Sequence, residues 1–184
     1  EQGILWHEVK LELLSPLRPG QQPAQDTACI FVPPPNTQFG VISDIDDTVI
    51  HTDVTHLLHM LRTVLLGNAR TRMPLHGVAA FYRALLGGKK GDTTNPLFYV
   101  SSSPWNLYDL LSEFFQINQI PLGPMLFLRD WGISKEDIFG PRQKHRPYKL
   151  ATIRHNMDAF PILPFILIGD SAEEDPEIYS EIVH

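Results

Sequence analysis

Three carboxylates follow one short apolar run and form the most chemically distinctive feature of the sequence. Asp44, Asp46 and Asp47 lie within four residues, at the end of a largely apolar run over 39–45. Carboxylates this close repel one another unless a cation neutralises them, and their hard oxygens favour Mg2+. In an extended chain Asp44 and Asp46 point the same way, so one could attack a phosphorus atom while the other donates a proton and then acts as a base.

Two other interpretations of this cluster differ in what they require. A calcium-binding EF-hand loop starting at Asp44 would need Gly and Glu where the chain has Val49 and Thr55, so it is excluded. An acidic loop that caps the next helix remains an alternative.

A second acidic segment, Gly169 to Asp175, follows the apolar run 165–168. We expect Asp170 to reach a metal shared with Asp44, and Asp175 to support it from one shell further out. The alternative is the solvated first turn of a helix, where acids complement the helix dipole.

A serine cluster and one lysine complete the candidate site. Ser101 ends an apolar run, where its hydroxyl and nearby backbone N–H groups could hold a phosphate oxygen; Ser102 could assist or be only a turn residue. The G-x-S-x-G motif of serine hydrolases is missing from the sequence. We expect Lys149 to begin a helix and to neutralise a phosphoryl group, although a solvated helix lysine is the alternative.

Strands must alternate with helices to bring these residues together. The periodicity predicts an α/β fold with a largely parallel sheet, whose ligands bind at the carboxyl ends of the strands. A short β segment is expected before it. The predicted strands are 4–14, 28–32, 39–45, 97–100, 125–128 and 165–168, and the predicted helices are 55–66, 77–86, 106–115, 148–160 and 175–183.

Composition limits the functional classes. The chain has 184 residues, of which 43% are hydrophobic and 20% charged, which is typical of a globular domain. The lone Cys29 favours a reducing compartment, and the net charge of -6 argues against nucleic acid as a partner.

The charge is unevenly distributed along the chain. Eight of the 21 acids lie at 44–47 and 170–177, and eleven of the 15 bases lie in two acid-free stretches, 54–91 and 141–157. Such basic stretches could hold an anionic substrate or lie against anionic lipid, or they could be ordinary solvated helix faces.

The motifs Asp44-Ile45-Asp46-Asp47-Thr48, Ser101, Lys149 and Gly169-Asp170 to Asp175 resemble, in order, the four motifs of the haloacid dehalogenase (HAD) superfamily of phosphohydrolases. From about Trp6 onward the chain is similar to the catalytic domain of the actin-patch phosphatidate phosphatases. This resemblance implies a Rossmann-like core and Mg2+-dependent phosphatase activity, most simply phosphatidate to diacylglycerol through an aspartyl-phosphate.

The resemblance also implies individual roles. Asp44 would be the nucleophile and a metal ligand, and Asp46 the acid/base whose backbone carbonyl binds the metal. Ser101, Ser102 and Lys149 would bind phosphate, Asp170 would complete the metal site, and Asp47, Thr48 and Asp175 would support it. The family lysine usually follows a histidine directly, whereas His145 lies four residues before Lys149.

Other expectations concern organisation and alternatives. We expect residues 1–36 to be the tail of a small β unit, and residues 37–184 to be a C-terminally incomplete catalytic domain with a helical cap at about 52–73. A phosphorylated small molecule or phospholipid is the expected partner, in the cytoplasm or peripherally at a membrane surface. A soluble sugar or nucleotide phosphatase, and a non-catalytic phosphate- or membrane-binding module, are the competing interpretations.

Overall fold

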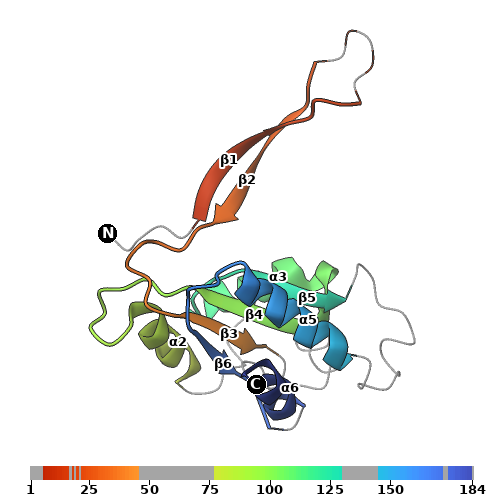
Figure 1. Ribbon diagram of the computed structural model, residues 1–184. Helices are drawn as coiled ribbons and strands as arrows, with labels where there is room; N and C mark the ends of the chain where they lie inside the picture. The colour runs from red at the N-terminus through yellow and green to blue at the C-terminus, as the bar shows by residue number, and fades with distance from the viewer. Residues whose placement is uncertain are drawn as a thin grey trace.

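The chain was analysed as a computed structural model (Figure 1). The structure describes residues 6–16, 18, 20, 22–45, 77–129, 145–171 and 174–183. The predicted helix 55–66 and the predicted cap 52–73 therefore lie outside the described residues. No helix of the described part is both long and apolar enough to span a membrane.

A four-stranded parallel sheet forms the centre of the molecule and confirms the predicted α/β fold. Its order is β5-β4-β3-β6, so β3 lies between β4 and β6. All five residues of β3 are buried, as expected for a central strand covered on both faces. The strands are β3 (Gly40–Asp44), β4 (Leu97–Pro104), β5 (Met125–Arg129) and β6 (Phe165–Ile168).

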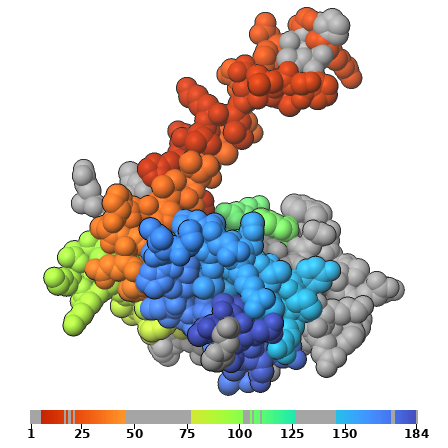
Figure 2. Space-filling view, viewed as in Figure 1, coloured from red at the N-terminus to blue at the C-terminus, as the bar shows by residue number. Residues whose placement is uncertain are grey.

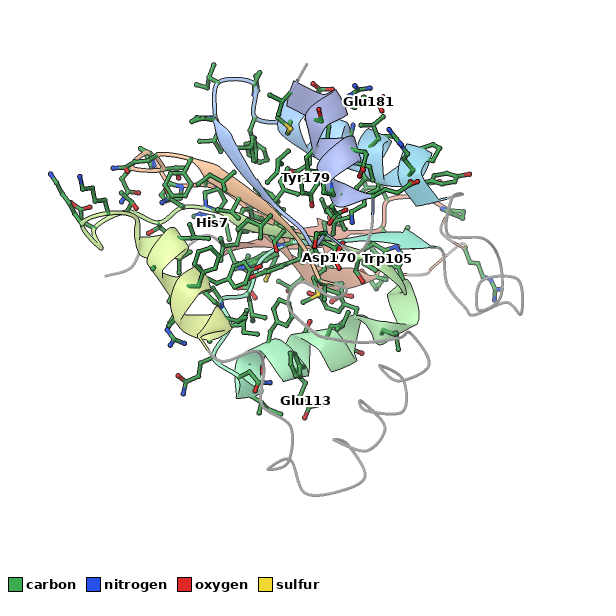
Figure 3. All side chains as sticks on the ribbon, turned by 90° about the horizontal axis from the view of Figure 1, so that it is seen from below. His7, Trp105, Glu113, Asp170, Tyr179 and Glu181 are labelled. Carbon is green, nitrogen blue, oxygen red and sulfur yellow. The ribbon has the colours of Figure 1, made fainter. Side chains whose placement is uncertain are left out.

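Helices cover both faces of this sheet. In Figure 3, α2 and α3 lie on one side of the strands and α5 and α6 lie on the other. Successive β3 side chains alternate between these layers: Val41 and Ile45 join the α2/α3 core, and Ile42 joins the α5/α6 core. The helices are α2 (Val78–Gly87), α3 (Tyr108–Ile117), α5 (His145–Asp158) and α6 (Asp175–Val183).

A two-stranded antiparallel hairpin projects from this core. Strands β1 (Trp6–Glu12) and β2 (Gln25–Phe31) pair over their whole length. Figure 2 shows this hairpin extending away from the rest of the molecule. Among the described ring contacts, one joins its base to the core: the ring centroids of Phe31 and Phe98 lie 5.4 Å apart. Within the hairpin, the ring centroid of Trp6 lies 5.0 Å from that of Phe31.

Several predicted boundaries were wrong, each for a structural reason. β2 begins at Gln25, three residues before the predicted strand, because it pairs with all of β1. β4 continues to Pro104, four residues beyond the predicted end, because it stays paired with β5. A 3-10 turn, η1 (Trp105–Leu107), delays α3 to Tyr108.

The C-terminal elements followed the sequence more closely. β6 and α6 have the predicted bounds. α5 begins at His145, three residues before the predicted start, so Lys149 lies one turn inside this helix and does not begin it. The predicted domain boundary after residue 36 stays a prediction.

Candidate active site

Asp44 lies at the carboxyl end of the central strand with its side chain in the α5/α6 layer. The side chain is buried, with 1% of its surface exposed. Strand alternation explains its direction, because Ile42 two residues earlier faces the same layer. Ser43, between them, faces α2 instead.

A buried ion pair joins Asp44 to Lys149. The Lys149 Nζ lies 2.7 Å from Asp44 Oδ1, across 105 residues of sequence. The same ammonium lies 2.5 Å from Asp175 Oδ1 at the start of α6. One buried cation is thus shared by two buried carboxylates.

This arrangement favours the charged form of the lysine. Burial lowers the pKa of Lys149, but the negative charges of Asp44 and then Asp175, with their hydrogen bonds, outweigh that effect and raise the pKa above 10.5. Lys149 therefore carries its positive charge at neutral pH, as a phosphate-binding role requires.

Gly169 and Tyr179 fix the position of Asp175. A Cβ atom at Gly169 would overlap the Asp175 carboxylate, so the close approach of that carboxylate requires glycine. The Tyr179 hydroxyl donates to the Ile168 carbonyl at 3.0 Å and lies 3.4 Å from Asp175 Oδ2. Burial, and then the charges of Asp175 and Asp44, raise the pKa of Tyr179 well above 10.0.

A second hydrogen-bond chain lies on the other face of strand β3, beside Asp44. The hydroxyls of Tyr82 on α2 and Ser43 lie 2.5 Å apart, and Ser43 Oγ donates to the Asp44 backbone carbonyl at 2.9 Å. Both side chains are buried. Ser43, Tyr82 and Tyr179 were not among the predicted site residues. Signals were present: Ser43 interrupts an apolar strand, and Tyr179 lies one helical turn after Asp175.

Strand register brings Ser101 and Asp170 to the same edge of the sheet. Val100 is the β4 partner of Asp44, so buried Ser101 lies one residue beyond it. Ile168 is the β6 partner of Ser43, which places Asp170 just past the level of Asp44 on the neighbouring strand. Figure 3 shows Asp170 at this end of the strands. The predicted Asp46, Asp47 and Thr48 lie outside the described residues, as does the side chain of Ser102.

Comparison with known proteins decides the family. The sequence model of the phosphatidate phosphatase APP1 catalytic domain matches residues 39–184. The chain belongs to this family. The expected resemblance is thereby confirmed.

Two fungal relatives show the extent of the similarity. Phosphatidate phosphatase APP1 of Saccharomyces cerevisiae is 31% identical over 182 residues, which cover 98% of this chain and 29% of the yeast protein. An uncharacterized protein of Schizosaccharomyces pombe is 31% identical over 143 residues, 77% of this chain and 22% of its own length. The chain thus spans less than a third of the length of these two relatives.

Two carboxylates near the ends of neighbouring strands have the oxygen chemistry that hard divalent cations prefer. Asp44 and Asp170 provide oxygen donors from neighbouring strand ends. Among the described residues, no group of three or more His, Cys, Asp and Glu is arranged to hold a metal.

The structure describes part of the two basic stretches, and three of their arginines make side-chain contacts. Arg146 and Arg154 of α5 lie 3.2 and 3.9 Å from carboxylate oxygens of Glu181 on α6. Arg83 of α2 donates to the backbone carbonyl of Gln119. These three guanidinium groups are engaged within the protein.

Proposed function

We propose that this protein is a phosphatase that hydrolyses phosphatidate to diacylglycerol and phosphate. The observation that carries the proposal is the buried Lys149–Asp44 pair at the end of β3, in a chain of the APP1 catalytic-domain family. A buried carboxylate beside a charged lysine suits attack on a phosphoryl group, because the ammonium can stabilise the developing negative charge.

The proposed reaction has two displacements. An Asp44 oxygen attacks phosphorus, the ester P–O bond breaks, and Asp46 gives its proton to the leaving diacylglycerol oxygen. Water then attacks the aspartyl-phosphate, loses a proton to Asp46, and releases phosphate with Asp44 restored. Lys149, Ser101 and Ser102 would bind the phosphoryl oxygens during both steps.

A divalent cation belongs to this proposal. Asp44, the backbone carbonyl of Asp46, and Asp170 would hold Mg2+, with Asp47, Thr48 and Asp175 supporting the site. When bound, Mg2+ supplies charge neutralisation for the carboxylates and the phosphate.

Asp44→Asn tests the nucleophile. The amide cannot form an acyl-phosphate, so we expect turnover of a generic phosphomonoester with Mg2+ to fall to background. Asp158→Asn, at the exposed far end of α5, is the matched control and should retain activity. Full turnover by a folded Asp44→Asn protein would refute the assignment.

A substrate panel tests the lipid specificity. We expect faster hydrolysis of phosphatidate in mixed micelles than of sugar or nucleotide phosphates, and loss of activity on chelation that Mg2+ restores. Equal rates on all substrates would support the alternative of a soluble small-molecule phosphatase. A phosphatidate substrate favours a cytoplasmic location with peripheral contact at a membrane surface.

A further inference from the structure

The projecting hairpin has backbone edges that no other strand of the described structure covers. β1 and β2 form a sheet of two strands, so each strand has one free edge. A two-stranded sheet is at best marginally stable in water, and a third or fourth strand adds stability. A free edge also presents N–H and C=O groups that can bind a further strand. An additional strand would therefore stabilise the hairpin.

The register of the hairpin identifies the backbone groups on the free edge of β1. Just beyond β1, the N–H group of Leu13 donates to the Ala24 carbonyl on the returning arm, at 2.9 Å. Successive residues of an antiparallel strand direct their backbone groups to opposite sides, so the odd-numbered residues of β1 bond to β2. The outward N–H and C=O groups therefore belong to the even-numbered residues, which are Trp6, Glu8, Lys10 and Glu12.

The charges on this edge favour one register for an antiparallel copy of β1. Val9 is the middle residue of β1, so pairing centred on Val9 uses the whole strand. That register places Glu8 opposite Lys10 of the second copy, twice by symmetry. Pairing centred on Glu8 or on Lys10 would instead place like charges directly opposite each other, which is destabilising. Among the described residues, neither Glu8 nor Lys10 forms an ion pair within its own chain.

The free edge of β2 is less suited to such pairing. Its outward residues carry no charge that would select a register; they are Gln25, Thr27, Cys29 and Phe31. The ring of Phe31 also contacts Phe98 of the core. Three prolines, which lack the N–H group of a strand, follow at 33–35. β1 is therefore the edge that fits a second chain.

We propose that two copies of this chain associate through the free edges of β1 and form a four-stranded antiparallel sheet. Val9 of each copy meets the other at the two-fold axis, and Ala28 is the partner of Val9 in β2, so an apolar row crosses one face of the sheet. Trp6 lies at the base of the hairpin, so the antiparallel arrangement places the two α/β domains at opposite ends of the sheet. The inference does not depend on the proposed phosphatase activity.

Reversal of the charges tests the register in the whole chain. The contact is small, so we expect a dissociation constant of the order of 10–100 µM by sedimentation equilibrium, with dilute protein monomeric. Glu8→Lys creates two Lys–Lys contacts and should raise this constant about tenfold. Adding Lys10→Glu reverses both pairs and should restore the wild-type constant. Glu113→Lys, the same charge change at an exposed position of α3, is the control and should dimerise like the wild type.

Cysteine cross-linking locates the two-fold axis and traps a weak dimer. The background is Cys29→Ser, and oxidised glutathione is the oxidant. Val9→Cys should form an intermolecular disulfide, because the two copies of position 9 face each other with Cα atoms about 4.5 Å apart. Leu11→Cys, on the same face, should form little, because its counterpart lies about 13 Å away along the strand.

A wild-type chain that stays monomeric at about 1 mM would overturn the proposal and assign the free edge to a different strand. A double charge variant that dimerises as weakly as Glu8→Lys would overturn the register. An equal loss of association in Glu113→Lys, or equal cross-linking of Leu11→Cys and Val9→Cys, would also contradict pairing through β1.

Discussion

At the scale of single residues, Lys149 balances two carboxylates that could not otherwise be buried together. Removing one partner of a buried ion pair typically costs about 3–5 kcal/mol, because the remaining charge is left without compensation. We expect Lys149→Met to lower the free energy of urea unfolding by this amount. Lys10→Met, on the exposed hairpin, should change it by about 0.5 kcal/mol at most.

A double variant separates charge from packing. Without Lys149, the carboxylates of Asp44 and Asp175 are buried with no compensating charge. Adding Asp175→Asn to Lys149→Met removes one of these two charges, so the free energy of unfolding should rise part of the way back to the wild-type value. Additive losses in the double variant would show that the lysine acts through packing and not through charge.

The Tyr82 hydroxyl is predicted to position Asp44, the proposed nucleophile, through Ser43 on the opposite face of β3. Tyr82→Phe removes the hydrogen bond to Ser43, whose own hydroxyl binds the Asp44 carbonyl. We expect a stability loss of about 1 kcal/mol and a fall in kcat of about fivefold, with KM little changed.

Tyr99→Phe is the matched control for this substitution. Its hydroxyl donates to the Pro121 carbonyl at 2.8 Å and is also part of the α2/α3 core. A similar stability loss with unchanged kcat is expected. Equal kcat losses in both variants would mean that general loosening of the core, and not the Ser43 contact, affects turnover.

At the scale of elements, the junction between β6 and α6 depends on one glycine. A methyl group at Gly169 would displace the Asp175 carboxylate and so disturb Lys149. Gly169→Ala should reduce phosphatase activity strongly and lower the thermal midpoint. At Gly87 an added Cβ atom would have no neighbouring atom within 4 Å, and the backbone conformation does not require glycine. Gly87→Ala should therefore leave activity unchanged and preserve or raise the thermal midpoint. A fully active Gly169→Ala protein would contradict the packing argument.

The elements also show what the sequence could predict. β6 and α6 were predicted to the residue because an apolar run is followed by Gly, Asp and an acidic first turn, all local signals. The end of β4 was missed because pairing with β5 holds serines in a strand, which is a tertiary effect.

The site residues show the same difference between local signals, which the sequence reveals, and tertiary contacts, which it does not. The sequence identified Asp44 and Lys149 as candidate site residues, and the structure brings Lys149 Nζ to 2.7 Å from Asp44 Oδ1. Ser43 and Tyr82 escaped prediction because their importance arises from a contact between a strand and a helix 39 residues away.

At the scale of the whole molecule, buried protonated groups make the fold sensitive to alkali. Burial raises the pKa of Tyr82 and of Tyr99 above 10.0, and the pKa of Lys149 lies above 10.5. The native protein keeps these protons while the unfolded chain releases them, so their stabilisation is complete below about pH 10 and is lost as pH rises through the native pKa values.

Urea unfolding over the alkaline range checks this expectation. Each such group should contribute about 1.4 kcal/mol per pH unit to the decline above its unfolded pKa. Tyr99→Phe should therefore show a shallower decline than the wild type. A stability that stays constant up to pH 11 would contradict the burial of these groups.

The projecting hairpin gives the molecule a built-in reporter position. Cys29 is the only cysteine of the chain, and it is exposed on β2 opposite Glu8, away from the layers that enclose Asp44. A thiol-reactive dye would therefore attach at one site without touching the catalytic machinery. Energy transfer from that dye to a labelled bilayer would measure the tilt of the domain in the proposed membrane-bound state, an orientation that enzyme rates do not report.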